Sequence, residues 1–280
     1  MTNGPVLGID AGGTGTRAVL VEGGTVVRRF TGAPMNVLLH ADAVDRLGAL
    51  IAESGASLVG IGLPGLRGAQ QTADLSERLS AATSATVVVG NDADAALAGA
   101  FPDGDGAVVL AGTGSIALGR SHGVPHRAGG HGFLIGDEGS GWWIGQQAVR
   151  AALVERDHGR LPGNLSIALT EALQTDLDGI VARVHADPRD RALLAGLVPA
   201  VAACDDDMAR AVLAAAADAL AELAETIRRA LAAPDLPVAY VGGVFGCRAV
   251  RERFVTATGA VAPQYPPEMA AALMAQAAAG

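Results

Sequence analysis

The fold follows from one stretch near the start of the chain, Val6-Leu-Gly-Ile-Asp-Ala-Gly-Gly-Thr-Gly-Thr-Arg17. A short apolar run leads into a glycine-threonine turn, and Val19-Leu-Val21 then continues in residues that favour strands. Such a turn closes a hairpin, whereas a Rossmann fingerprint or a Walker loop would open a helix. Further on, Ala107-Val-Val-Leu110 leads into a similar turn, Ala111-Gly-Thr-Gly-Ser115. The repetition predicts a chain of two similar halves.

Two glycine-threonine turns together can hold the phosphates of a nucleotide. The chain contains no lysine, so a Walker lysine and any Schiff-base mechanism are excluded. Bound phosphate would rely on backbone N–H groups, hydroxyls, arginine and metal. One such turn alone is better explained as an ordinary tight hairpin, because glycine readily adopts positive φ. Two of them, with Asp10 leading the first, favour an ATP-dependent phosphotransferase.

Composition sets further bounds on function. The 280 residues suffice for one large or two ordinary domains, and the net charge of -9 disfavours nucleic acid as a partner. No apolar run approaches the ~20 residues of a membrane span, so we expect a soluble, cytoplasmic protein with no membrane partner. Cys204 and Cys247 lack the spacing of a zinc site or a disulfide framework.

Hydrophobic periodicity predicts the order of the elements. The first half has three strands in residues 5–30 with a hairpin turn at Glu22-Gly-Gly-Thr25, a helix in 41–55, a strand at 58–63, a second helix and a strand at 86–89. The second half has strands at 107–111 and 115–119, a glycine-rich segment, mostly helix from about 140 to 232, a strand at 238–241 and a helix at 268–279. This order predicts an α/β fold. We expect one domain at 1–106 and another, with a helical insertion, at 107–267, with helix 268–280 able to pack back on the first.

Acidic residues follow a β-branched run in Val89-Gly-Asn-Asp-Ala-Asp-Ala95. Asp92 can be interpreted as an N-cap, since Asn and Asp accept hydrogen bonds from the first N–H groups of a helix. It can also be a general base, because ligands of open α/β sheets bind at the carboxyl ends of strands. Residues two apart on a helix point about 200° from each other, so Asp92 and Asp94 cannot serve the same site. We favour Asp92, at the strand end, as the chemical residue.

A second polar segment, Gly129-Gly-His-Gly-Phe-Leu-Ile-Gly-Asp-Glu-Gly-Ser-Gly-Trp-Trp-Ile144, is too rich in glycine for a regular element. It could be a solvated surface loop, but long loops in compact domains are often functional. Its two tryptophans lead into a helix, where we expect them to pack and not to stack on a ligand. His131 could hydrogen-bond either a ligand hydroxyl or the backbone.

In their order along the chain, these motifs resemble those of the N-acetylglucosamine kinase family, the BadF/BadG/BcrA/BcrD-type ATPases. The resemblance is carried by Asp10-x-Gly-Gly-Thr-x-Thr-Arg17, Asp92, Gly112-Thr-Gly-Ser115, Gly136-Asp-Glu-Gly-Ser140 and Gly242-Gly-Val244. It runs from the first strand to the last helix. It implies the fold of the sugar kinase, heat-shock chaperone and actin superfamily, which is two ribonuclease H-like domains around a central ATP cleft.

The resemblance also implies roles for particular residues. The β- and γ-phosphates of ATP would lie at Gly12, Gly13 and Thr14 and at Gly112, Thr113 and Gly114. Asp10 would hold Mg²⁺ through water, and Gly242 and Gly243 would lie against the adenosine. That glycine pair alone fits a plain strand-to-helix turn better. The sugar would contact Asn36, Asp92, Ser115, Gly130, His131, Gly132 and Asp137.

The implied activity is that of a kinase with Asp92 as the general base, acting on the 6-hydroxyl of an amino sugar, N-acetylglucosamine or glucosamine. The implied assembly is a homodimer. His131 stands where relatives commonly have tryptophan. This departure leaves open the choice among N-acetylglucosamine, glucosamine, N-acetylmuramic acid and a plain hexose.

Other members of the superfamily are the alternatives. An activator ATPase of the 2-hydroxyacyl-CoA dehydratase type shares the ATP motifs but needs cysteines for an iron-sulfur cluster, and Cys204 and Cys247 lie in the wrong contexts. A sugar sensor or an actin-like assembly protein is a third interpretation, and intact Asp10 and Asp92 argue against a kinase that has lost its activity. The zinc-containing kinase branch is excluded because its cysteine cluster is missing.

Overall fold

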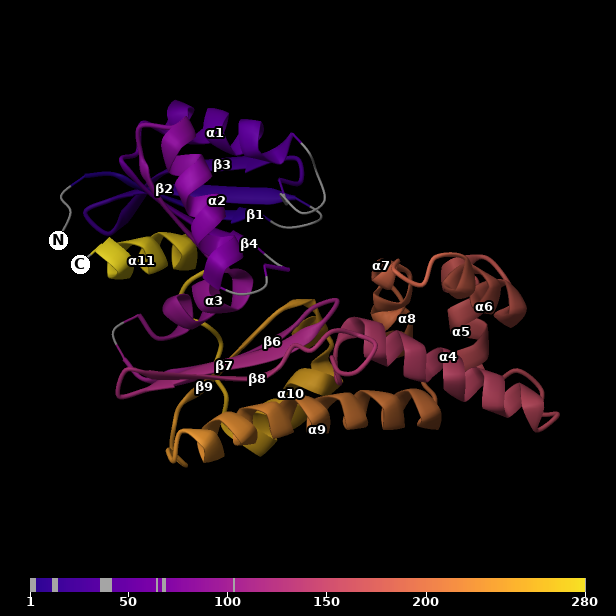
Figure 1. Ribbon diagram of the computed structural model, residues 1–280. Coiled ribbons are helices and arrows are strands. Elements are labelled where there is room, and N and C mark those ends of the chain that lie inside the picture. The colour runs from indigo at the N-terminus through magenta and orange to yellow at the C-terminus, as the bar shows by residue number, and fades with distance from the viewer. Residues whose placement is uncertain are drawn as a thin grey trace. The chain divides into compact units, whose positions relative to one another are not determined.

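The protein was studied as a computed structural model that describes residues 4–11, 15–35, 42–63, 65–66, 69–102 and 104–279. Its internal contacts divide the chain into two compact units, whose helices and strands are labelled in Figure 1. Unit 1 comprises Met1–Gly104 and Pro263–Gly280, and unit 2 comprises Asp105–Ala262. Each unit contains one β-sheet with helices, so the predicted α/β class is confirmed.

Unit 1 is built on a five-stranded sheet in the order β3-β2-β1-β4-β5. The strands are β1 (Val6–Ala11), β2 (Thr16–Glu22), β3 (Thr25–Gly32), β4 (Leu58–Leu63) and β5 (Thr86–Asn91). β1 runs antiparallel to β2, with Ala11 opposite Thr16, so these two strands form the predicted hairpin. β1 runs parallel to β4, which runs parallel to β5. These three parallel strands therefore end at one edge of the sheet.

Helices cover both faces of this sheet (Figure 1). The helices of unit 1 are α1 (Ala43–Ser54), α2 (Ala69–Ala82), α3 (Asp92–Ala100) and α11 (Pro267–Ala279). Leu7 of β1 belongs to a buried cluster with Leu47 of α1 and Leu79 of α2. The adjacent Val6 belongs to a second cluster with Met269 of α11. This alternation is expected because successive side chains of a strand point to opposite faces.

Two glycines allow α11 to lie close against the sheet. A methyl group built on Gly8 would lie 2.0 Å from the carbonyl oxygen of Glu268, and one on Gly60 would lie 1.8 Å from that of Ala271. Neither position could carry a side chain unless α11 moved. The C-terminal helix is thus a full layer of unit 1, and it brings Glu268 beside β1.

Unit 2 is built on a four-stranded sheet in the order β8-β7-β6-β9. The strands are β6 (Gly106–Ala111), β7 (Ser115–Ser121), β8 (Val124–Gly129) and β9 (Val238–Val241). β6 runs antiparallel to β7, so the second glycine-threonine turn also closes a hairpin. The residue pattern does not predict β8, which contains Pro125. Proline is tolerated there because β8 lies at the edge of the sheet.

Helices make up most of the rest of unit 2. They are α4 (Gly141–Asp157), α5 (Asn164–Leu173), α6 (Leu177–Ala186), α7 (Arg191–Ala195), α8 (Val198–Ala203), α9 (Asp207–Ala230), the short 3₁₀ helix η1 (Gly243–Gly246) and α10 (Arg248–Thr258). The helical stretch predicted before residue 232 is confirmed, whereas η1 and α10 were not predicted. Across the described ranges, no helix is long and apolar enough to cross a membrane.

The glycine-rich segment is irregular over a shorter range than predicted. Its last residues, Gly141–Ile144, form the first turn of α4, because Ser140 caps that helix by accepting a hydrogen bond from the N–H of Trp143. Trp142 and Trp143 pack against the core of unit 2, as expected. The irregular part therefore ends at Ser140.

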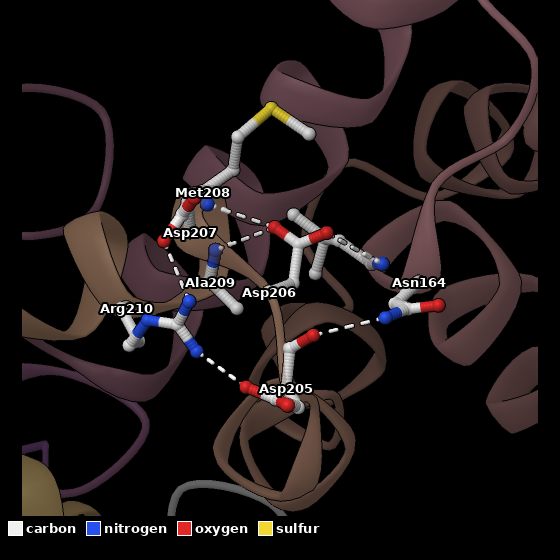
Figure 2. A network of polar contacts seen from close by, with 8 residues as sticks. Asn164, Asp205, Asp206, Asp207, Met208, Ala209 and Arg210 are labelled. Carbon is white, nitrogen blue, oxygen red and sulfur yellow. Dashed lines mark hydrogen bonds and ion pairs between the residues drawn. The ribbon is translucent and has the colours of Figure 1, made fainter.

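Consecutive acidic residues at the start of α9 have structural partners (Figure 2). Asp206 Oδ1 accepts hydrogen bonds from the N–H groups of Met208 and Ala209 at 2.8 and 3.2 Å. Asn164, the first residue of α5, donates to the carbonyl oxygen of Asp205 at 2.9 Å. This network ties the start of α5 to the start of α9.

Candidate functional site

The two carboxylates predicted to carry the chemistry lie at one edge of the sheet of unit 1. Asp10 of β1 is in register with Gly62 of β4, and Leu63 of β4 is in register with Asn91 of β5. Asp92 follows immediately as the first residue of α3. The edge at which parallel strands end is the usual ligand-binding edge of an open α/β sheet.

Asp10 forms an ion pair with Arg17 of β2. Arg17 Nη2 donates a hydrogen bond to Asp10 Oδ2 at 2.8 Å, and the two residues are direct partners in the β1–β2 register. This hydrogen bond raises the pKa of Arg17 above its usual value. The Asp10 side chain is 21% exposed, so its carboxylate is accessible to a ligand.

The start of α3 is capped by the neighbours of Asp92. Asn91 is the N-cap, and Asp94 completes a capping box with it. The interpretation of Asp92 as the N-cap is therefore wrong. Asp92 Oδ1 accepts a hydrogen bond from the N–H of Ala93 at 3.1 Å. Burial raises the pKa of Asp92 above its usual value, and the negative charge of Asp10 raises it further.

Four of the predicted contact residues lie outside the described residues. They are Gly12, Gly13 and Thr14 of the first turn, and Asn36. Their roles stay predictions.

In unit 2, the second glycine-threonine turn closes against the start of α4. The N–H of Gly112 donates to the carbonyl oxygen of Gly114 at 2.9 Å. The N–H groups of Gly141 and Trp142 donate to the carbonyl oxygens of Gly112 and Thr113 at 2.8 and 3.3 Å. The first turn of α4 thus fixes the conformation of the turn that was predicted to bind phosphate.

The glycines of the predicted nucleotide site differ in how much room each would leave for a side chain. Gly242 has a φ of 115°, and a methyl group there would lie 2.3 Å from the carbonyl oxygen of Ala111. The packing of the chain itself therefore requires glycine at 242. Gly112 and Gly243 have no such φ, and a methyl group at either would meet no described atom within 4 Å. Neither packing nor backbone conformation explains glycine at these two positions, which leaves space for a ligand.

Asp137 is a buried carboxylate beside the same turn. Its Oδ1 accepts a hydrogen bond from the N–H of Gly132 at 3.2 Å, and its Oδ2 lies 3.9 Å from Arg191 Nη1. A methyl group built on Gly114 would lie 2.7 Å from the same Oδ2. Burial raises the pKa of Asp137 above its usual value. The turn and the carboxylate thus fit closely against each other.

The other predicted sugar contacts lie in or next to the loop that precedes α4. The buried Ser115 donates its hydroxyl to the carbonyl oxygen of Glu138 at 2.8 Å. Gly130 and Gly132 have φ values of 68° and 90°, which glycine readily adopts. His131 is exposed. The loop thus brings Ser115, Gly132 and Asp137 together through hydrogen bonds.

Two arginines at these sites received no role from the sequence. Arg17 was part of the quoted motif, and its position after the turn could have indicated a partner for Asp10. Arg191 approaches Asp137 from a helix distant in sequence, and no residue pattern points to it.

The donor chemistry of Asp10 fits Mg²⁺. This cation prefers oxygen ligands and is commonly held by one or two carboxylates together with water and substrate phosphates. Among the residues that the structure describes, no cluster of three or more His, Cys, Asp or Glu could hold a metal by itself. The carboxylate of Asp10 therefore suits a cation that also binds the phosphates of a nucleotide.

Comparison with protein families identifies the relatives of the chain. Residues 7–275 match the model of the BadF/BadG/BcrA/BcrD ATPase family. The chain belongs to this family. The resemblance drawn from the motifs is thereby confirmed.

The curated relatives that match are sugar kinases. An N-acetylmuramic acid/N-acetylglucosamine kinase of Clostridium acetobutylicum is 36% identical over 171 residues, which cover 54% of this chain and 54% of that protein. The match thus spans about half the length of that relative. A glucosamine kinase of Vibrio cholerae is 29% identical over 217 residues, which cover 72% of this chain and 73% of that protein.

A solved structure resembles the chain over its whole length. It is a candidate N-acetylglucosamine kinase from Chromobacterium violaceum, which is 30% identical with a TM-score of 0.78 and covers 98% of this chain and 99% of its own. The fold expected from the motifs, that of the actin-like sugar kinases, is therefore confirmed.

Proposed function

We propose that the chain is an ATP-dependent kinase that phosphorylates an amino sugar, N-acetylglucosamine or glucosamine, at the 6-hydroxyl. Membership of an ATPase family supports ATP as the phosphoryl donor. The names of the relatives support an amino sugar as the acceptor.

One observation carries this proposal, namely the surroundings of Asp92. Its neighbours Asn91 and Asp94 cap α3, so Asp92 is not needed for that task. Burial raises its pKa above the usual value, and Asp10 lies at the same sheet edge. A carboxylate with these properties supports a reaction in which a hydroxyl must lose its proton.

The proposed mechanism assigns each step to residues of the chain. Asp92 accepts the proton of the sugar hydroxyl. The hydroxyl oxygen bonds to the γ-phosphorus of ATP as the bond between that phosphorus and ADP breaks. Asp10 would hold Mg²⁺, which neutralises charge on the phosphate oxygens. We assign the phosphates to the turns Gly12–Thr14 and Gly112–Gly114, and the adenosine to Gly243 with Gly242 shaping the backbone.

We assign the sugar hydroxyls to the loop of unit 2 and to Asn36. Asp137 is the main candidate for a sugar contact. Gly132 donates a hydrogen bond to Asp137, and Ser115 donates one to the adjacent Glu138. Gly130 and His131 directly precede Gly132 and complete the proposed set. The proposal includes a cytoplasmic location, and a homodimer as the family resemblance implies. Light scattering of the purified protein tests the dimer.

A coupled ADP-release assay tests the proposed function. Purified protein with Mg-ATP is given N-acetylglucosamine, glucosamine, N-acetylmuramic acid, glucose or no sugar, and ³¹P NMR then locates the phosphate on the product. We expect strong stimulation by an amino sugar and a 6-phosphate product. ATP binding with no stimulation by any sugar would contradict the kinase assignment and favour the ATPase-switch or sensor interpretation.

A further inference from the structure

One guanidinium lies between two carboxylates in unit 1. Arg17 donates a hydrogen bond to Asp10 at 2.8 Å, and its Nε lies 3.9 Å from Oε2 of Glu268 on α11. The Arg17 side chain is 59% exposed, so it has room to change its rotamer. It therefore makes a full hydrogen bond with one acid and only a distant ion pair with the other.

The carboxylate of Glu268 lacks hydrogen bonds in this arrangement. Its side chain is only 10% exposed, and its buried Oε2 has no hydrogen-bond partner among the described residues. Its Oε1 lies 3.7 Å from Arg29 Nη1, which is also longer than a hydrogen bond. A buried carboxylate oxygen without a hydrogen bond is costly, so this state of Glu268 calls for an explanation.

We propose that the Arg17 side chain alternates between two carboxylate partners, Asp10 and Glu268. In this inference, which rests on the proposed function, Arg17 holds Asp10 while that carboxylate lacks a cation. When Asp10 takes Mg²⁺ with the nucleotide, the displaced guanidinium turns to Glu268 and gives its Oε2 the missing hydrogen bond. Glu268 is thus a positioning residue that acts on the nucleotide site through Arg17.

Replacing Glu268 and replacing Arg29, which lies near Glu268, should have opposite effects on cation binding. Arg17 competes with the cation for Asp10, and Glu268 weakens that competition by attracting Arg17. Replacing Glu268 by glutamine should leave Arg17 more firmly on Asp10 and weaken cation binding. Replacing Arg29 should leave Glu268 with one counterion fewer and so strengthen cation binding. Because Arg17 is exposed, each effect should be modest, about two- to fivefold.

Calorimetric titration with the ATP analogue AMP-PNP measures these effects without turnover. The ratio of its dissociation constant in EDTA to that in Mg²⁺ reports how strongly the cation contributes to binding. We expect this ratio to fall about two- to fivefold in Glu268→Gln and to rise in Arg29→Gln. Arg28→Gln is the matched control, because Arg28 lies on the same strand, pairs with Glu53 and should leave the ratio unchanged.

A double-mutant cycle separates this role from a merely structural one. In an Arg17→Gln background, Glu268→Gln should no longer change the ratio, since the residue through which it acts is missing. An unchanged ratio in Glu268→Gln alone, or the same change with and without Arg17, would overturn the inference. If the unaltered protein binds AMP-PNP equally well with and without Mg²⁺, the role of Asp10 fails, and the inference fails with it.

Discussion

Asn91 and Asp94 cap each other across the first turn of α3. Asn91 Oδ1 accepts a hydrogen bond from the N–H of Asp94 at 2.7 Å, and Asp94 Oδ2 accepts one from the N–H of Asn91 at 3.3 Å. Asp92 lies between them in sequence and belongs to neither bond. The residues that hold the helix start are therefore distinct from the carboxylate proposed to act on the substrate.

Removal of the N-cap should affect stability. Asn91→Ala should lower the free energy of unfolding by about 1 kcal/mol, because the N–H of Asp94 loses its acceptor. Urea unfolding followed by circular dichroism measures this change. Asp42→Ala is the matched control, since Asp42 precedes α1 without a side-chain capping bond and should change stability less. Equal losses in the two variants would contradict the capping argument.

The rate of the reaction should depend on pH through Asp92. Burial favours the neutral carboxyl in the folded protein, so its pKa lies above the ordinary value of 3.8. The ionised base is then lost as pH falls through this raised pKa, so kcat/KM, which reports the free enzyme, should begin to decline at a pH above 3.8. A profile of kcat/KM against pH, with folding checked at each point, measures the midpoint. A midpoint at or below that of an ordinary aspartate would count against Asp92 as the base.

A side chain at Gly243 should interfere with nucleotide binding and leave the fold intact. A methyl group there meets no described atom within 4 Å, so Gly243→Ala should unfold at the same temperature as the unaltered protein. Its affinity for AMP-PNP should fall about tenfold, as for an overpacked contact. Gly48→Ala in α1, where the nearest atom would be 3.9 Å away, is the control and should keep full affinity. Full affinity in Gly243→Ala would remove the glycine from the adenosine site.

Loss of the Asp137 charge should affect the sugar and spare the nucleotide. Asp137→Asn keeps a side chain that tolerates the observed φ of 62°. We expect the KM for the sugar to rise about ten- to a hundredfold, because a charged hydrogen-bond acceptor is lost, while the KM for ATP stays nearly constant. Steady-state kinetics with each substrate varied measure both values. Glu138→Gln removes the same charge from an exposed neighbour and should change neither. A sugar KM equally unchanged in Asp137→Asn would refute the assignment.

The fold was predictable wherever its signals are local. β4 and β9 have the predicted bounds, since each is a short apolar run between turns. β8 was not predictable, because Pro125 and its polar neighbours become a strand only through pairing with β7. The formation of β8 therefore depends on tertiary contacts and not on its residue pattern.

The sequence motifs of the site were predictable, but the side chains that pair with one another within it were not. The residue pattern locates Asp92 at a strand end and the second glycine-threonine turn, and the family resemblance implies Asp137. The pairing of Arg17 with Glu268 joins the second strand to the last helix, and charge patterns do not indicate which arginine meets which acid. The difference between Gly242 and Gly243 was likewise hidden, because it depends on a backbone angle and on the approach of Ala111.

The most direct test of the account compares the turnover of Asp92→Asn and Asp94→Asn with the best sugar of the ADP-release panel. Asp92→Asn removes the proposed proton acceptor, so its kcat should fall by about 10²- to 10⁴-fold while its affinity for Mg-AMP-PNP stays nearly constant. Asp94→Asn removes the same charge two residues away and should keep most of its kcat. Unchanged turnover in Asp92→Asn, or an equal loss in both variants, would contradict the assignment of Asp92 as the base.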